Sequence, residues 1–103
     1  GAADANPYII LSAVIASGLW GVKNECPLEP MVKGNAYDQA FSEELTLPRT
    51  LWQAAQKLKV SNMAREYFGD AFVDHFAASR EWEEREYRKH ISKWEMDRYF
   101  EII

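Results

Sequence analysis

The sequence predicts an all-α fold, with an apolar helix near the start, a long loop, and three to four capped helices in the second half. Two observations carry this prediction. Apolar residues recur at helical spacing behind residues that cap helices, and no segment alternates apolar and polar residues as a strand does. With 103 residues the chain is at most one domain, so residues 1–103 are expected to form a single helical segment.

The first helix is predicted to start at Pro7, which suits the first helical position, with Asn6 as its N-cap. It should stop within residues 21–24. Its own apolar side chains point out on nearly all sides, and a helix of this kind is normally buried. They are Tyr8, Ile9, Ile10, Leu11, Val14, Ile15, Leu19 and Trp20. The rest of the chain is too short and too polar to enclose this helix, so we expect a piece of a larger protein.

Residues 25–49 are predicted to form one long loop. Proline and glycine interrupt every regular period in it, at Pro27, Pro30, Gly34 and Pro48. The pair at residues 31–32 is too short to be assigned as a strand. Loops of this length in compact domains are usually functional or mobile, and we expect the same of this loop.

Two short helices should follow the loop. Thr50 and Gln53 have the pattern of a capping box, in which each side chain bonds the backbone N–H of the other residue. Ser61 or Asn62 is expected to cap the second helix. Gly69 is placed to end it in a left-handed conformation, because glycine adopts positive φ without strain.

The longest helix is predicted over residues 71–91, with Asp70 as its N-cap. Its first half is apolar and its second half is charged. Two pairs in the second half have the i,i+4 spacing of helical ion pairs, namely Glu81 with Arg85 and Glu84 with Arg88. A second capping box, Ser92 with Glu95, should begin a last helix that runs to residue 100.

Composition and charge exclude several classes of protein. A net charge of −4 gives no electrostatic footprint for nucleic acid or for an anionic membrane. The apolar run at residues 8–22 is shorter than the roughly 20 residues of a membrane-spanning helix, and no basic region precedes it as in a signal peptide. The single cysteine, Cys26, fits a reducing compartment. We therefore expect a cytoplasmic protein with no nucleic-acid or membrane partner.

The residues show no recognisable catalytic or metal site. His75 and His90 are about four turns apart on one predicted helix, and neither has a second ligand at metal-binding spacing. Four acidic residues are interleaved with arginines, as is typical of a solvated helix face: Glu81, Glu83, Glu84 and Glu86. Three aromatic residues lack a basic patch and are assigned to packing in a core or an interface: Trp82, Tyr87 and Trp94. We predict no catalytic, cofactor-binding or metal residue in this chain.

Several motifs follow one another along the chain. Residues 1–8 read GAADANPY and open a helix rich in small residues that ends in GLWGV at 18–22. LPRTL stands at 47–51, FGDAFV at 68–73 and WEMDRY at 94–99. This order resembles the C-terminal part of the catalytic domain of the glutamine synthetase family, and the opening and ending are similar to its branch of γ-glutamyl-amine ligases.

The resemblance implies that the whole protein is an ATP-dependent ligase. In this family the γ-carboxylate of glutamate is phosphorylated, and ammonia or an amine then displaces phosphate to give a γ-glutamyl amide. Divalent Mg or Mn ions clamp the phosphates, and arginines neutralise the charge that develops during transfer. In the family these groups lie upstream of the part that resembles this chain, so the resemblance assigns no catalytic, metal or nucleotide residue here. It implies an inactive helical portion of an α+β catalytic domain, within a ring-forming homo-oligomer.

Two places carry a further implication of the resemblance. Some bacterial glutamine synthetases are adenylylated on a loop tyrosine in the context NLYDL, and residues 35–39 here read NAYDQ. Tyr37 is therefore a candidate for regulatory modification, and the alternative is an ordinary loop tyrosine. In several members the C-terminal tail reaches into a neighbouring subunit. Residues 99–103 are apolar enough for that role, and the alternative is that they fold back on their own subunit.

A second interpretation does not depend on the resemblance. The chain could be a free-standing helical interaction module, such as a dimer that buries residues 8–22 between two chains. A long coding sequence upstream of residue 1 would favour the ligase, and a reading frame that begins there would favour the module. Under both interpretations the isolated chain exposes a large apolar patch on its first helix and should associate.

Overall fold

The computed structural model describes residues 2–100 and 102, and within these residues every regular element is helical. The elements are α1 (Pro7–Lys23), the short 3-10 turns η1 (Ala36–Asp38) and η2 (Glu43–Leu45), α2 (Leu51–Lys59), α3 (Asn62–Phe68), α4 (Asp70–Arg88) and α5 (Lys93–Tyr99). The predicted all-α fold class is confirmed, as is the order of one apolar helix, a long loop and then four further helices, of which α2, α3 and α5 have a side-chain N-cap. The two 3-10 turns inside the loop were not predicted.

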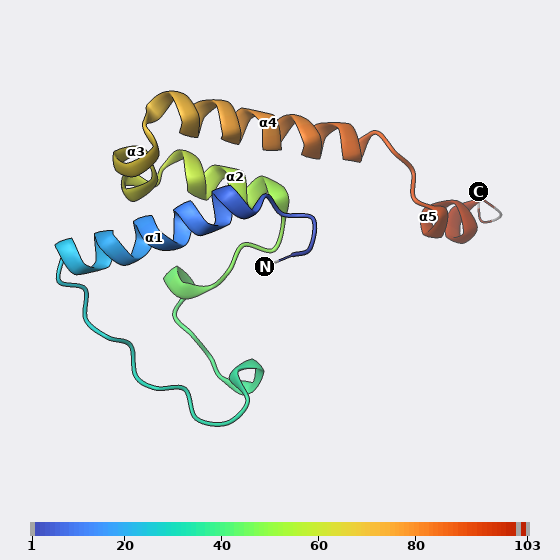
Figure 1. Cartoon of the computed structure of the whole chain (residues 1–103). Coiled ribbons are helices and arrows are strands. Elements are labelled where there is room, and N and C mark those ends of the chain that lie inside the picture. The colour runs from blue at the N-terminus through green and yellow to red at the C-terminus, as the bar shows by residue number, and fades with distance from the viewer. Residues whose placement is uncertain (1, 101, 103) are drawn as a thin grey trace.

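Helices α2 and α4 lie side by side, and α3 joins them at one end (Figure 1). Small side chains form the buried part of this unit. Ala55 of α2, Ala64 of α3 and Ala77 of α4 are buried, and Val73 of α4 has 0% of its surface exposed. Helix axes approach more closely when the side chains at the contact are small. The three helices therefore form a closely packed unit, which contains nearly all of the core.

The turn between α3 and α4 depends on Gly69. Ser61 caps α3 by accepting the N–H of Ala64 at 3.1 Å. Gly69 ends α3 and precedes α4 with φ +81° and ψ 154°, a region that essentially only glycine adopts. Its positive φ was predicted, although ψ lies outside the left-handed helical region. Asp70 is the first residue of α4 and not its N-cap, because Gly69 takes that position and the Asp70 carboxylate binds Arg65.

One of the two predicted capping boxes is complete. At the start of α5, Ser92 Oγ accepts the N–H of Glu95 at 3.2 Å, and Glu95 Oε2 accepts the N–H of Ser92 at 2.8 Å. At the start of α2, Thr50 Oγ1 accepts the N–H of Gln53 at 3.1 Å. Gln53 Oε1 reaches back one residue further than predicted and accepts the N–H of Arg49 at 2.9 Å. Both helices therefore begin at the residues that the sequence indicated.

Helix α1 has the predicted cap but not the predicted burial. Asn6 Oδ1 accepts the N–H of Tyr8 at 2.9 Å. The helix lies against α3, and only Ala16 is buried. Most of its large apolar side chains are exposed, and Val14 is 64% exposed. The described residues do not surround this helix, because they are too few to do so.

The chain is extended for its length. Its radius of gyration is 18.1 Å, whereas a compact domain of this length has about 13 Å. Its accessible surface is 9392 Å², against roughly 6,000 Å² for a folded monomer of this mass. The long loop extends away from the helices, and α5 lies apart from α4 (Figure 1). Helix α4 ends at Arg88 and not at residue 91 as predicted, and residues 89–92 form the connection to α5.

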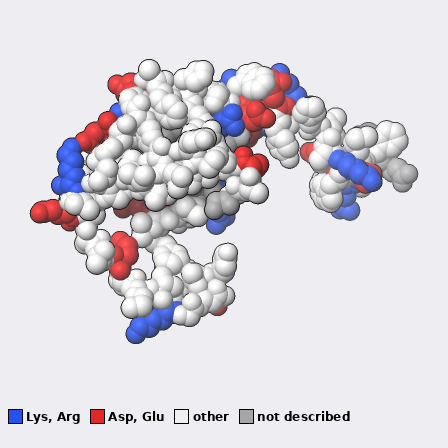
Figure 2. All heavy atoms as spheres, in the orientation of Figure 1, with Lys and Arg blue, Asp and Glu red and all other residues white. Residues whose placement is uncertain are grey.

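Charged and uncharged groups are unevenly distributed over the surface. Figure 2 shows uncharged atoms over most of the central helical body, with acidic and basic side chains gathered at its edges. A wide uncharged face of this kind is typical of a surface that meets another surface. No helix among the described residues is both long enough and apolar enough to cross a membrane.

Candidate functional site

The long loop presents Tyr37 to solvent. Tyr37 lies in η1 and is 97% exposed. The Asn35 side chain accepts the N–H of Tyr37 at 3.1 Å, and the Gln39 side-chain amide donates to the carbonyl of Lys33 at 2.7 Å. Gly34 supplies the positive φ, +79°, with which the chain enters this turn. The turn is thus closed by its own residues, and the Tyr37 side chain is open to another protein.

Glu81 is paired across two helices. Its Oε1 accepts from Lys59 Nζ at 2.8 Å and from Gln56 Nε2 at 2.6 Å, and both donors lie on α2. The bond from Lys59 and then the bond from Gln56 hold the pKa of Glu81 below its usual value of 4.5. The predicted ion pair with Arg85 is wrong, because Glu81 faces α2 and binds a lysine there.

The acidic stretch of α4 is not uniformly solvated as predicted. The expected pair of Glu84 with Arg88 is present, with 2.7 Å between Oε1 and Nε. Glu84 is nevertheless only 8% exposed. It lies seven residues after Ala77, and this spacing returns it to the side of α4 that contains the buried residues. Glu86 pairs with Lys89 at 2.6 Å on a more exposed side.

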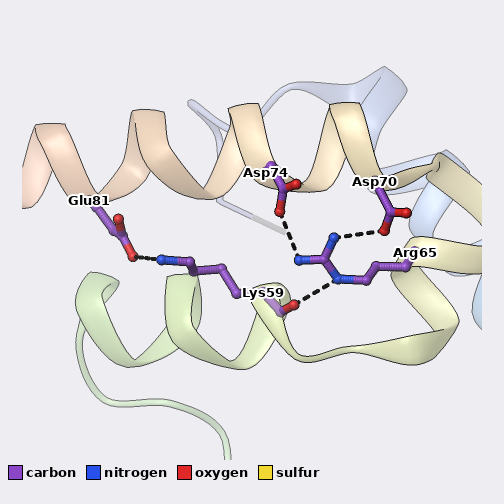
Figure 3. Close-up of polar contacts among 5 residues, drawn as sticks. All are labelled: Lys59, Arg65, Asp70, Asp74 and Glu81. Atoms are coloured by element: carbon purple, nitrogen blue, oxygen red, sulfur yellow. Dashed lines mark hydrogen bonds and ion pairs between the residues drawn. The ribbon is translucent and has the colours of Figure 1, made fainter.

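Arg65 of α3 connects all three packed helices (Figure 3). Its Nε donates to the carbonyl of Lys59 at 2.9 Å, at the end of α2. Its Nη1 and Nη2 donate to Asp70 and Asp74 of α4, both at 2.8 Å. The carboxylates of Asp74 and Asp70, in that order, raise the pKa of Arg65. We call these residues with Glu81 the polar clip of α2, α3 and α4.

No pattern in the sequence indicated the contacts of Arg65 or Lys59. A helical ion pair is recognised by a spacing of three or four residues. Arg65 lies five and nine residues before its two aspartates, with the turn at Gly69 between them. Lys59 lies 22 residues before Glu81. Such pairs become visible only when the helices are placed in space.

The histidines and the cysteine do not converge on a site. His75, His90 and Cys26 are all exposed, and Cys26 is a free thiol. His90 lies in the connection after α4 and not on that helix as predicted. Within residues 2–100 and 102, no group of three or more His, Cys, Asp or Glu residues could hold a metal ion.

The aromatic residues assigned to packing lie at the surface. Trp82, Tyr87 and Trp94 are all exposed. Trp94 meets Tyr99 of the same helix edge-on, with 6.0 Å between the ring centroids. These residues were predicted to lie in a core or in an interface. Within the described residues they do not lie in a core.

A hollow of about 730 Å³ lies between the end of the long loop and α2. Its walls carry both signs of charge, from Glu43, Arg49 and Lys57. The Lys57 ammonium already donates to the carbonyl of Thr46 at 2.9 Å. No hydrogen bond among the lining residues joins a nucleophile to a base, which is the geometry that marks a site of acyl transfer.

Comparisons with known proteins agree along nearly the whole chain. The family model of the glutamine synthetase catalytic domain matches residues 1–99. Type-1 glutamine synthetase 2 of Dictyostelium discoideum is 44% identical, over 97% of this chain and 20% of that protein. A glutamate–isopropylamine ligase of Pseudomonas is 36% identical, over 98% of this chain and 22% of that protein.

A γ-glutamylethanolamide synthetase of Streptomyces coelicolor is 33% identical, over 95% of this chain and 21% of that protein. The chain thus spans about a fifth of the length of these curated relatives. No solved structure matches it significantly.

Proposed function

The chain belongs to the glutamine synthetase catalytic-domain family, and on this premise we propose that residues 1–103 are the C-terminal helical portion of an ATP-dependent ligase. The reaction would phosphorylate the γ-carboxylate of glutamate and then release phosphate as ammonia or an amine attacks, leaving a γ-glutamyl amide. The single observation that carries the proposal is the family match over residues 1–99. These residues would belong to an α+β domain and support its active site without performing catalysis.

We place the ATP site and the Mg or Mn ions of this ligase outside residues 1–103. The described residues offer no cluster for a metal ion, and their carboxylates are engaged with lysine and arginine where they are most buried. What this chain contributes is helical structure. The closely packed α2, α3 and α4 unit would stand behind the active site, and the apolar face of α1 would pack against the rest of the domain.

The acceptor is proposed to be ammonia or a small amine. The relatives support both choices, because one is named a glutamine synthetase, one a glutamate–isopropylamine ligase and one a γ-glutamylethanolamide synthetase. The amine branch is the finer proposal, and it rests on the similarity of the opening and the ending of the chain.

The test uses the full-length protein. Phosphate release from ATP is measured with glutamate and, in separate reactions, ammonia, isopropylamine or ethanolamine, and the product is identified by mass spectrometry. We expect glutamate-dependent phosphate release with at least one acceptor, and no activity from residues 1–103 alone. Absence of a γ-glutamyl product with all three acceptors would count against the ligase. A preference for ammonia would remove the amine branch alone.

Tyr37 is proposed as a site of regulatory nucleotidylation in the same protein. Its side chain is almost fully exposed, on a turn that its own residues close. Mass spectrometry of the full-length protein from nitrogen-replete cells should find the peptide that contains Tyr37 heavier by one nucleotidyl group. A peptide that is consistently unmodified would leave Tyr37 an ordinary loop tyrosine.

We propose a homo-oligomeric ring in which the C-terminal tail contacts a neighbouring subunit. Of residues 99–103, Glu101 and Ile103 lie outside the described residues. Phe100 and Ile102 are exposed, and α5 stands apart from the other helices. Deletion of residues 100–103 from the full-length protein should lower the mass of the oligomer in light scattering, and an unchanged mass would argue that the tail folds back on its own subunit.

The second candidate function is a free-standing helical module that dimerises through α1. The exposed apolar face of α1 favours it, because such a face needs a partner of some kind. Light scattering of the 103-residue chain should show association under both hypotheses, and a monomer at high concentration would contradict both. Phosphate release by the full-length protein separates them. The free thiol of Cys26 supports a reducing, cytoplasmic compartment for either protein.

A further inference from the structure

Glu84 is the one charged residue that is buried among residues 2–100 and 102. Its Oε1 accepts from Arg88 Nε at 2.7 Å. Its Oε2 is buried and has no hydrogen-bond donor among the described residues. A buried carboxylate oxygen without a donor is unfavourable, because it has lost its contact with water and gained nothing in exchange. A donor placed next to this oxygen in the complete protein would remove that penalty.

Glu84 forms part of the wall of a cavity of about 370 Å³ between the start of α2 and the second half of α4. The other lining residues are Thr50, Leu51, Glu83 and Tyr87. Two of these five residues are carboxylates, and none of them is basic. Arg88 does not line the cavity, and its own side chain is mostly exposed. The walls of the cavity are mostly apolar, and the two carboxylates among its lining residues have no basic residue beside them in the lining.

The walls define the chemistry of the occupant. Carboxylates bind a cation by charge-assisted hydrogen bonds. The Tyr87 ring and the Leu51 side chain offer apolar surface to an aliphatic stem, and an aromatic face also attracts a cation. Lysine and arginine side chains combine a cationic end with an apolar stem, and the cavity suits one of them.

The surroundings indicate that this cation is carried by a protein surface. Tyr87 and Ile91 are among the exposed large apolar residues of this part of the chain, and Leu51 and Trp52 are partly exposed as well. A small ligand in the cavity would leave these side chains in water. The chain also spans only about a fifth of its relatives, so most of such a protein lies outside residues 1–103.

We propose that a lysine or arginine from the part of the same polypeptide outside residues 1–103 inserts between α2 and α4 and binds the Glu84 carboxylate, with Glu83 beside it. This inference rests on the proposed function, in which these residues belong to a larger catalytic domain. The inserted side chain would fix the position of the α2, α3 and α4 unit against the rest of that domain.

A cryo-EM structure of the full-length protein is the direct test. We expect a lysine or arginine nitrogen within about 3 Å of a Glu84 oxygen, from a residue of the same subunit outside residues 1–103. A basic residue from a second subunit, an apolar side chain or solvent in the cavity would each overturn the proposal.

Thermal unfolding of full-length variants gives a second test. The direction in which the unfolding midpoint shifts decides between a cavity with a cation and one without. In an Arg88→Gln background, Glu84→Gln removes a carboxylate that has lost its partner within the described chain. If a second cation is present, the unfolding midpoint should fall by roughly 2–4 °C. If none is present, removing an unpaired buried charge should leave the midpoint unchanged or raise it, which overturns the proposal. Glu86→Gln in the same background is the control, because Glu86 pairs with Lys89 outside the cavity, and it should leave the midpoint within about 1 °C.

The same preparation is assayed for glutamate-dependent phosphate release from ATP. If the protein is active but its cavity holds no cation, this inference is contradicted and the proposed ligase is not. If the cavity holds a basic side chain but the protein has no ligase activity, the proposed ligase fails and the inserted cation is retained. The two proposals can therefore fail separately.

Discussion

The α2, α3 and α4 unit and the helix α1 differ in how much of their stabilisation comes from this chain. The unit has a buried core of small side chains and the polar clip of Arg65, Lys59, Glu81, Asp70 and Asp74 across its helices. Helix α1 has more large apolar side chains and buries only Ala16. Its contact with α3 includes one ion pair between exposed groups, Lys23 with Glu66. Hydrophobicity alone therefore does not tell which helix is buried in a given chain.

This difference separates two kinds of helix. A helix of mixed composition, such as α4, can satisfy its apolar side against one neighbour and its polar side against water. A helix that is apolar on nearly all sides, such as α1, needs neighbours all round. In the described residues it has α3 on one side. The comparison predicts that equal substitutions in the two regions have unequal effects.

The largest effect is expected for Val73→Asp, measured against Val14→Asp in the 103-residue chain. Val73 is fully buried, so an aspartate there places an unpaired charge in the core and should lower the free energy of unfolding by about 3 kcal/mol or more. Val14 is exposed in the single chain, so at a concentration low enough to keep the chain monomeric the same change should cost no more than about 0.5 kcal/mol. Urea unfolding followed by circular dichroism gives both values.

The same pair of substitutions should have a different outcome in the full-length protein. If α1 packs against the rest of the domain there, Val14→Asp should become as damaging as Val73→Asp. An innocuous Val14→Asp in the full-length protein would mean that α1 faces solvent in the whole molecule as well.

The second effect concerns the turn that holds α3 against α4. Gly69→Ala should lower the free energy of unfolding of the 103-residue chain by about 1–3 kcal/mol, because φ +81° with ψ 154° is strained for any residue with a Cβ. The space around the added Cβ is open, so the loss would come from the backbone alone. Urea unfolding measures it, and an unchanged midpoint would mean that the turn relaxes to another conformation.

The third effect appears in acid. The pKa of Glu81 is held below its usual value of 4.5 in the folded chain, so ionised Glu81 stabilises the fold. This stabilisation is fully present above the usual pKa and is lost as the pH falls through the lower, folded pKa. Glu81→Gln should therefore flatten the decline of stability below pH 4.5 while it removes stability at neutral pH. Thermal unfolding of the 103-residue chain across the pH range measures this, with Glu83→Gln as the matched control. If the stability of Glu81→Gln and of the wild type declined equally in acid, the pairing with Lys59 would be contradicted.

The smallest effect has the opposite sign. Gly18 lies inside α1, and a Cβ added to it would meet nothing within 4 Å. Gly18→Ala should therefore stabilise the 103-residue chain by about 0.5–1 kcal/mol, because alanine loses less conformational freedom in a helix. Urea unfolding of Gly18→Ala is also measured in the full-length protein. A loss of stability there would show that another element approaches the backbone of α1 closely at this residue, and a gain would show open space.

The residues of this chain were enough to predict the starts of four of the five α-helices and the family. Caps and helical periodicity act over three or four residues, so Asn6, Thr50, Ser61 and Ser92 could be read directly as helix starts. The local errors of this prediction were the N-cap and the last residues of α4 and the two 3-10 turns of the loop. The order of motifs resembled the glutamine synthetase family, and the family match later confirmed that membership.

Only the tertiary structure decided which groups meet. It paired Glu81 with Lys59 in place of Arg85, placed Arg65 between two aspartates of α4, buried Glu84, and left α1 exposed. These contacts join residues on different helices, and the turns between helices set the relative orientation without leaving a periodic signal in the sequence. For α1 the reason is different. Its composition calls for burial, but burial depends on how much protein surrounds a helix, which no local pattern in these 103 residues specifies.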